Sequence, residues 1–159
     1  METKSFRPQR QVPVFRKLAN QGLITNLKLQ KTSVAACVWE FNLSADLTIQ
    51  FDDGRSISMG NLSNYRFRVT YSRRTEPRVY IIAPVLKRRI HTWEQDDGRL
   101  CLYRPDLWSW RDNMQFDQEL FPQVALWTYY YELWLETGTW YGEEAPHPRK
   151  FRTTPKYVG

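Results

Sequence analysis

The sequence predicts an α+β domain in which a helix, an antiparallel meander and a cysteine-bearing loop precede C-terminal helical structure. Apolar residues recur at helical spacing near both ends of the chain, and between about 35 and 83 they alternate with polar residues. The two periods do not interleave as they do in βαβ folds. A length of 159 residues fits one core, so we expect a single domain over residues 1–159.

The N-terminal helix is predicted over residues 14–21, because good helix formers place apolar side chains on one face and Gly22 follows as a stop. Residues 1–12 and residues 148–159 are basic, contain proline and have few aliphatic side chains. We therefore expect a loosely held basic arm at about 1–12 and a similar tail at about 148–159.

Four stretches have the two-residue alternation of strands and are joined by short turns: 35–43, 47–51, 65–71 and 78–83. In residues 65–71, for example, aromatic and aliphatic side chains alternate with arginines, which predicts one core face and one solvent face. The short turns predict an antiparallel meander of about four strands.

The C-terminal helix is predicted from apolar residues at three- and four-residue steps, with Pro122 near its start and Gly138 at its end. Its aromatic and aliphatic positions are Trp127, Tyr130, Tyr131, Trp134 and Leu135. We expect this helix to pack on the sheet.

The net charge, the number of cysteines and the lack of long apolar runs limit the classes of function to consider. The balance of 23 basic and 17 acidic residues gives a net charge of +6, which favours an acidic partner or nucleic acid without deciding between them. Two cysteines exclude a disulfide framework and suggest a reducing compartment. No apolar run could span a bilayer and no secretory leader is evident, so we expect a soluble cytoplasmic protein.

Cys101 is the candidate nucleophile. It follows an acidic turn in an irregular segment, the kind of place where reactive groups occur more often than in core strands. It also stands between Leu100 and Leu102, and a cysteine between leucines is often a small core side chain, so both interpretations stay open at this point. Cys37 lies in an apolar strand and is predicted to be core.

The stretch from Pro77 to Tyr103 resembles the active-site segment of ubiquitin-conjugating enzymes. The matching features are Pro-Arg-Val-Tyr at 77–80, Ala-Pro at 83–84, His91, and Gly-Arg-Leu-Cys-Leu at 98–102. In that family a His-Pro-Asn triplet precedes the catalytic cysteine, and its histidine lies ten residues upstream, as His91 does from Cys101.

A second stretch, residues 131–148, is similar to the end of the ubiquitin-conjugating-like proteins of bacterial anti-phage cyclic-oligonucleotide signalling systems (CBASS). Together the two resemblances imply a ubiquitin-conjugating (UBC-like) fold. They imply that Cys101 is a catalytic nucleophile that takes a C-terminal carbonyl as a thioester and passes it to an amine. They imply a loop-organising role for His91, and His147 could orient the thioester or accept a proton.

One departure from the eukaryotic pattern concerns Trp93, which stands where that pattern has an asparagine that supports the oxyanion. A backbone N–H, His147 or a partner residue is a candidate substitute. The resemblance further implies a cGAS-like nucleotidyltransferase whose C-terminus is the cargo, with a target protein lysine as acceptor. No nucleotide-binding loop or paired metal-ligand spacing is present, so we expect no cofactor and no metal, and activation of the cargo from elsewhere.

Two rival functions remain. A catalytically idle scaffold of the same fold would bind and stabilise the synthase without any use of Cys101. A basic nucleic-acid-binding module would use the cluster at 87–89 and the N-terminal arm, and its affinity would fall steeply with salt. The aromatic residues of 65–71 share one face and are needed as core, which argues against a stacking platform.

Overall fold

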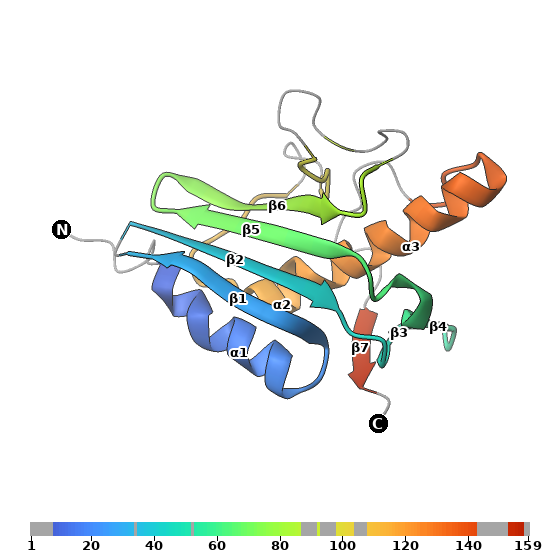
Figure 1. Ribbon diagram of the computed structural model, residues 1–159, viewed down its shortest axis with the longest axis horizontal. Coiled ribbons are helices and arrows are strands. Elements are labelled where there is room, and N and C mark those ends of the chain that lie inside the picture. Colours follow the sequence, from blue (N-terminus) through green and yellow to red (C-terminus); the bar gives the residue numbers. More distant parts are fainter. Residues whose placement is uncertain are drawn as a thin grey trace.

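The computed structural model describes residues 8–33, 35–51, 53–86, 92, 98–103, 108–142 and 153–157 (Figure 1). Its helices are η1 (Pro8–Gln11), α1 (Val12–Asn20), η2 (Gly60–Leu62), α2 (Phe116–Glu119) and α3 (Phe121–Thr137). Its strands are β1 (Ile24–Thr32), β2 (Ala36–Leu43), β3 (Leu47–Phe51), β4 (Ser56–Ser58), β5 (Arg66–Ser72), β6 (Thr75–Ala83) and β7 (Thr153–Tyr157). The α+β class with a four-stranded antiparallel sheet and C-terminal helices is confirmed.

The four strands of the larger sheet are not the four that the sequence predicts. The larger sheet has the order β1-β2-β5-β6, and all its neighbouring strands are antiparallel. Its first strand, β1, was not predicted, whereas the predicted strand at 47–51 is β3 and pairs with β4 and β7 in a second sheet. Leu27 and Leu29 alternate with Lys28 and Gln30, so β1 does have the two-residue period of a strand. The apolar signal is weak because β1 is an edge strand with many polar side chains.

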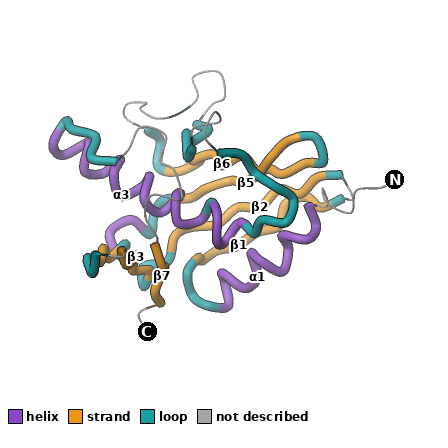
Figure 2. Tube along the Cα trace, turned by 180° about the vertical axis from the view of Figure 1, so that it is seen from behind, coloured by secondary structure: helices purple, strands orange, loops and turns teal. Residues whose placement is uncertain are grey.

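The core lies between the larger sheet and the helices. Views from the two sides show α1, α2 and α3 on one face of this sheet and leave the other face without a helix (Figures 1 and 2). On β2 the side chains of Cys37, Trp39, Phe41 and Leu43 are buried toward the helices. This alternation explains why the sheet has one apolar and one polar face.

Helix α1 begins two residues before the predicted start, since Pro13 fits the first turn of a helix, where its missing N–H is not needed. Val14, Phe15 and Leu18 form its buried face. The ring of Phe15 stacks on Trp39 of β2 with 4.5 Å between centroids, so aromatic packing fixes α1 against the sheet.

The structure describes one segment within the predicted arm and one within the predicted tail. Within the predicted arm, η1 contains the buried Gln11, whose Nε2 donates to the carbonyl of Met114 and whose Oε1 accepts from the N–H of Phe116. Within the predicted tail, β7 pairs with β3 along its whole length. Both contacts join segments about a hundred residues apart, which local composition cannot reveal.

Helix α3 confirms the predicted C-terminal helix, and residues 121–128 are all buried in it. Pro122 lies in its first turn, and the left-handed Gly138 (φ 75°) ends it by donating its N–H to the carbonyl of Trp134 at 2.8 Å. None of the helices in the described ranges has the length and apolar character needed to cross a membrane.

We expect Gly138→Ala to lower the free energy of unfolding by about 1 kcal/mol, because a residue with a Cβ is strained at positive φ. A Cβ at this position would meet nothing within 4 Å, so the effect comes from the backbone conformation alone. Urea unfolding followed by circular dichroism measures it. A loss beyond about 2 kcal/mol would show that the end of α3 has contacts that this explanation omits.

Candidate active site

Cys101 lies on a short extended segment beside β6. Tyr80 of β6 forms an antiparallel bridge with Arg99, while the N–H of Ile81 donates to the carbonyl of Gly98 at 3.0 Å and the N–H of Leu100 donates to the carbonyl of Val79 at 2.8 Å. Leu100 also forms a bridge with Thr92. The backbone that leads into the cysteine is therefore tied to the sheet.

The two flanking leucines show which way the cysteine points. Leu100 and Leu102 are each only 4% exposed, whereas Cys101 is partly exposed. Because successive side chains of an extended segment point to opposite sides, the leucines anchor the segment in the core and Cys101 projects away from it. Of the two interpretations of this cysteine, the structure favours the accessible thiol.

Cys37, the other cysteine, differs from Cys101 in its exposure. It is fully buried on β2, and its Sγ lies 3.2 Å from Thr32 Oγ1. The prediction that Cys37 is a core residue is confirmed, which leaves Cys101 as the accessible one of the two thiols.

Two opposing influences set the protonation of Cys101. Partial burial raises the pKa of its thiol, and the positive charge of Arg99 offsets part of that rise. Arg99 in turn pairs with Glu76 of β6, with 3.8 Å between Nη2 and Oε1. The resting cysteine is therefore a thiol whose deprotonation becomes easier wherever the surroundings add positive charge.

Besides the backbone bridge at Arg99, a side-chain contact between Tyr103 and Glu76 connects the cysteine segment to β6. The hydroxyl of Tyr103 hydrogen-bonds to the carboxylate of Glu76, and burial together with this bond raises the pKa of Tyr103. The ring of Tyr103 also packs edge-on against Trp108, with 4.5 Å between centroids. The bridge at Arg99 and the bond at Tyr103 thus hold the chain on both sides of Cys101.

A small cavity of about 20 Å³ lies between this segment and β6. Its walls come from the first half of β6 and from both sides of Cys101: Glu76, Pro77, Arg78, Val79, Arg99, Leu100, Leu102 and Tyr103. A space of this size holds one oxygen-sized group. The charged walls distinguish it from an ordinary packing gap.

Three residues singled out in the sequence, His91, Trp93 and His147, lie outside the described residues. The roles expected for the two histidines therefore stay predictions. Among the residues that the structure does describe, no group of three His, Cys, Asp or Glu side chains could hold a metal ion.

Sequence reasoning missed the charged residues around Cys101. Arg78 was part of a recognised motif but received no role, and Glu76 and Tyr103 received none either. The signal that could have found them is the two-residue alternation of β6 combined with that of residues 99–103. Without knowledge that these two stretches lie side by side, the alternation points to no common site.

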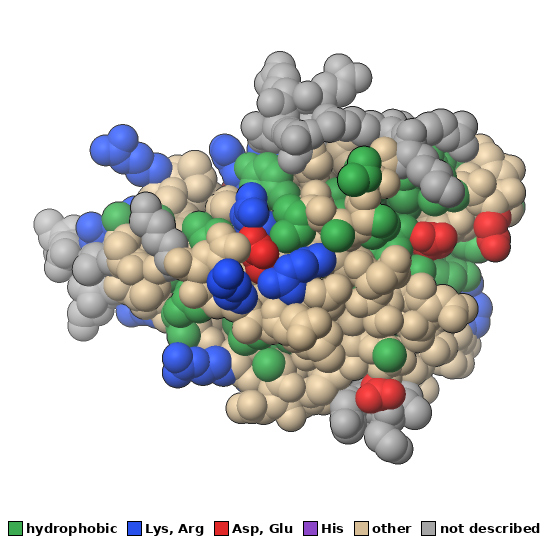
Figure 3. Space-filling model, in the orientation of Figure 1, with side chains coloured by type: hydrophobic (Ala, Val, Ile, Leu, Met, Phe, Trp, Pro, Cys, Tyr) green, Lys and Arg blue, Asp and Glu red, His purple; other side chains and the backbone are tan. Residues whose placement is uncertain are grey.

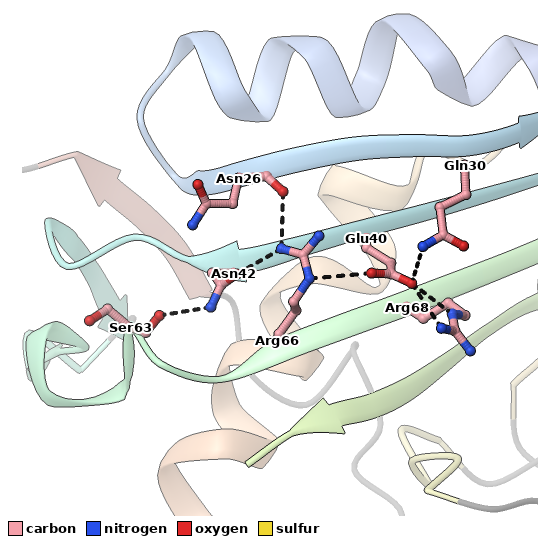
Figure 4. A network of polar contacts seen from close by, with 7 residues as sticks. All are labelled: Asn26, Gln30, Glu40, Asn42, Ser63, Arg66 and Arg68. Carbon is pink, nitrogen blue, oxygen red and sulfur yellow. Dashed lines mark hydrogen bonds and ion pairs between the residues drawn. The ribbon is translucent and has the colours of Figure 1, made fainter.

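The helix-free face of the sheet carries a second charged cluster, where basic side chains surround an acidic one (Figure 3). Glu40 of β2 is only 6% exposed and accepts from Arg66 Nε at 3.3 Å and Arg68 Nε at 3.0 Å (Figure 4). Gln30 also donates to it, and Arg66 reaches the side chain of Asn42 at 2.8 Å. Two arginines that sequence reasoning placed in solvent are therefore engaged with a carboxylate.

This network bears on the nucleic-acid alternative. Binding to a phosphate depends on net positive charge, and the charges of Arg66 and Arg68 are partly neutralised by Glu40, which binds both. Burial raises the pKa of Glu40, but the hydrogen bonds and charges of Arg68 and Arg66 outweigh this and lower it overall, so the carboxylate is ionised at neutral pH. This face consequently offers less free positive charge than the sequence suggests.

Comparison with known proteins identifies the family. Residues 40–148 match the family model E2-CBASS, described as type II CBASS E2 protein. The match spans more than half of the chain and includes β6, the cysteine segment and α3. No curated protein matches the chain.

Proposed function

The chain belongs to the type II CBASS E2 protein family, E2-like proteins of CBASS anti-phage systems, and on this premise we propose that it is a cysteine-dependent acyl carrier of UBC-like fold. In this proposal Cys101 accepts the C-terminal carbonyl of a cGAS-like nucleotidyltransferase as a thioester and transfers it to a lysine amine of a target protein. The observation that carries the proposal is the projection of Cys101 from a segment whose neighbouring leucines are buried.

The chemistry consists of two acyl transfers. The Cys101 thiolate attacks the carbonyl carbon of an activated acyl donor, a C–S bond forms, and the bond to the donor's leaving group breaks. An amine nitrogen then attacks the same carbon, the C–S bond breaks, and the amine proton goes to solvent while the thiolate leaves. Since burial raises the pKa of the Cys101 thiol, we expect the first transfer to depend on positive charge near the sulfur, such as that of Arg99.

A carrier of protein cargo also needs a surface for its partner, and the surroundings of β6 offer one. Val85, which follows β6, is 91% exposed. A hollow beside it is lined by Tyr80, Ile82, Pro84 and Leu86, by the charged Arg68, and by Gly98, the residue that opens the cysteine segment. A hollow of mixed polar and apolar character next to the cysteine segment, with an exposed valine at its rim, supports contact with a macromolecular partner.

The test is intact mass spectrometry of the protein co-purified with its proposed partner, a cGAS-like nucleotidyltransferase, with and without reducing agent. We expect wild type to carry an adduct that thiols cleave, and Cys101→Ser to carry either a thiol-stable ester or none. Cys37→Ala is the matched control, because it removes the other thiol from a buried site and should retain the adduct.

A stable complex in which no variant carries a covalent adduct would support the scaffold alternative instead. Affinity for DNA or RNA that falls steeply with salt, and that Cys101→Ser leaves unchanged, would support the nucleic-acid-binding alternative.

A further inference from the structure

One hydrogen-bond donor beside the cysteine has no acceptor in the part of the chain that the structure describes. The Nε of Arg78 is buried and has no hydrogen-bond partner among the described residues. A buried N–H without an acceptor is unfavourable, because it has lost its water and gained nothing in return. The cavity beside this donor holds one oxygen-sized group, so a water in the free protein or a substrate oxygen during the reaction can serve as the acceptor.

The strand register places Arg78 next to Cys101. The Tyr80–Arg99 bridge is antiparallel, so continuing it by two residues sets Arg78 opposite Cys101, and by four residues sets Glu76 opposite Tyr103. The hydrogen bond between Tyr103 and Glu76 supports this continuation. Opposite residues of an antiparallel pair have their Cβ atoms roughly 4.5–5.5 Å apart, which is well within the reach of an arginine side chain.

Size and charge identify what the cavity would accept. Its volume of about 20 Å³ admits one oxygen atom but no side chain. Of its two arginines, Arg99 already binds Glu76, whereas Arg78 presents the unpaired N–H. An arginine donates in a planar arrangement and stays charged, so a negatively charged oxygen is the acceptor that fits.

We propose that Arg78 donates a hydrogen bond to the oxyanion that forms when Cys101 accepts or passes on an acyl group, an inference that rests on the proposed function. When the thiolate attacks the carbonyl carbon, the C=O π pair moves to oxygen and gives the oxyanion. Collapse of the intermediate restores the C=O bond and expels the leaving group. Arg78 thereby supplies the oxyanion support that the eukaryotic pattern assigns to an asparagine, at the position that Trp93 occupies in this sequence.

The experiment compares two reactions of the same thiol in the isolated protein. Acylation by 4-nitrophenyl acetate forms an oxyanion and releases 4-nitrophenolate, whereas alkylation by iodoacetamide displaces iodide and forms no oxyanion. Cys101→Ala supplies the background rate for both. We expect Arg78→Gln to slow acylation about 10²-fold and to change alkylation less than about threefold. Arg78→Lys, which keeps the charge but loses the fork, should fall between wild type and Arg78→Gln.

Arg74→Gln is the matched control, because it removes the same charge from an exposed position in the turn between β5 and β6, and it should leave both rates unchanged. Equal slowing of acylation and alkylation by Arg78→Gln would overturn the proposal, since Arg78 would then act on the thiolate and not on the oxyanion. Unchanged acylation in Arg78→Gln would overturn it as well. Wild type that acylates no faster than Cys101→Ala would refute the proposed function itself.

Discussion

Replacing Glu40 by glutamine is expected to lower the free energy of unfolding by about 2–3 kcal/mol at pH 7. Glu40 is nearly buried and binds Arg66, Arg68 and Gln30 on the helix-free face of the sheet (Figure 4). Its loss leaves two guanidinium groups, two residues apart on the same face of β5, without their counter-charge. The effect is smaller than for a fully buried pair, because the side chain of Arg68 is 43% exposed and can regain water.

The contribution of Glu40 to the free energy of unfolding depends on pH, and the lowered pKa of Glu40 determines the direction of that dependence. The pKa of Glu40 is lowered in the fold, so the folded state binds this proton less readily than the unfolded state. Its contribution is therefore complete above the unfolded pKa of 4.5 and is lost as the pH falls through the folded pKa. Urea unfolding should accordingly show a constant difference between wild type and Glu40→Gln above about pH 5.5, and a shrinking difference below about pH 4.5.

Glu136→Gln provides the comparison, since Glu136 is exposed near the end of α3 and its replacement should change the free energy by less than about 0.5 kcal/mol. A Glu40→Gln variant as stable as wild type at pH 7 would contradict the expectation. It would mean that removing the carboxylate from its buried site gains as much as the broken ion pairs lose.

Local sequence was enough to predict α1, α3 and most of the larger sheet, because α1 and the strands each have one buried face and α3 is bounded by Pro122 and Gly138. It failed where pairing is non-local. The strand at 47–51 alternates as well as β2 does, yet its partners are β4 and the distant β7. A strand pattern predicts that a stretch pairs, but not with which other stretch, so β3 was assigned to the wrong sheet.

In the candidate site, too, local sequence patterns did not predict which distant residues lie together. Cys101 was a candidate from its irregular segment and from a resemblance, but its orientation became clear only from the burial of both neighbouring leucines. Arg78 and Glu76 are more than twenty residues away in sequence and meet the cysteine segment only through its pairing with β6. Their part in the site follows from the strand register, which no spacing rule provides.

That pairing depends on Gly98, and we expect Gly98→Ala to impair acyl transfer about 10²-fold. Gly98 has a φ of 77°, where a residue with a Cβ is strained by about 1–2 kcal/mol. A Cβ there would also lie 2.9 Å from the carbonyl oxygen of Ile81, and that contact is with backbone. The segment must therefore move away from β6 and weaken the hydrogen bond that Ile81 donates to Gly98.

Such a movement separates Cys101 from Arg78 without removing either side chain. The acylation of Cys101 by 4-nitrophenyl acetate should fall, while alkylation by iodoacetamide should stay the same or rise as the thiol becomes more exposed. Gly54→Ala is the matched control: Gly54 also has a positive φ, of 89°, but a Cβ there would meet nothing within 4 Å, so it adds the backbone strain without the clash. Normal acylation in Gly98→Ala would show that the position of Cys101 does not depend on its pairing with β6, and would remove the register on which the role of Arg78 rests.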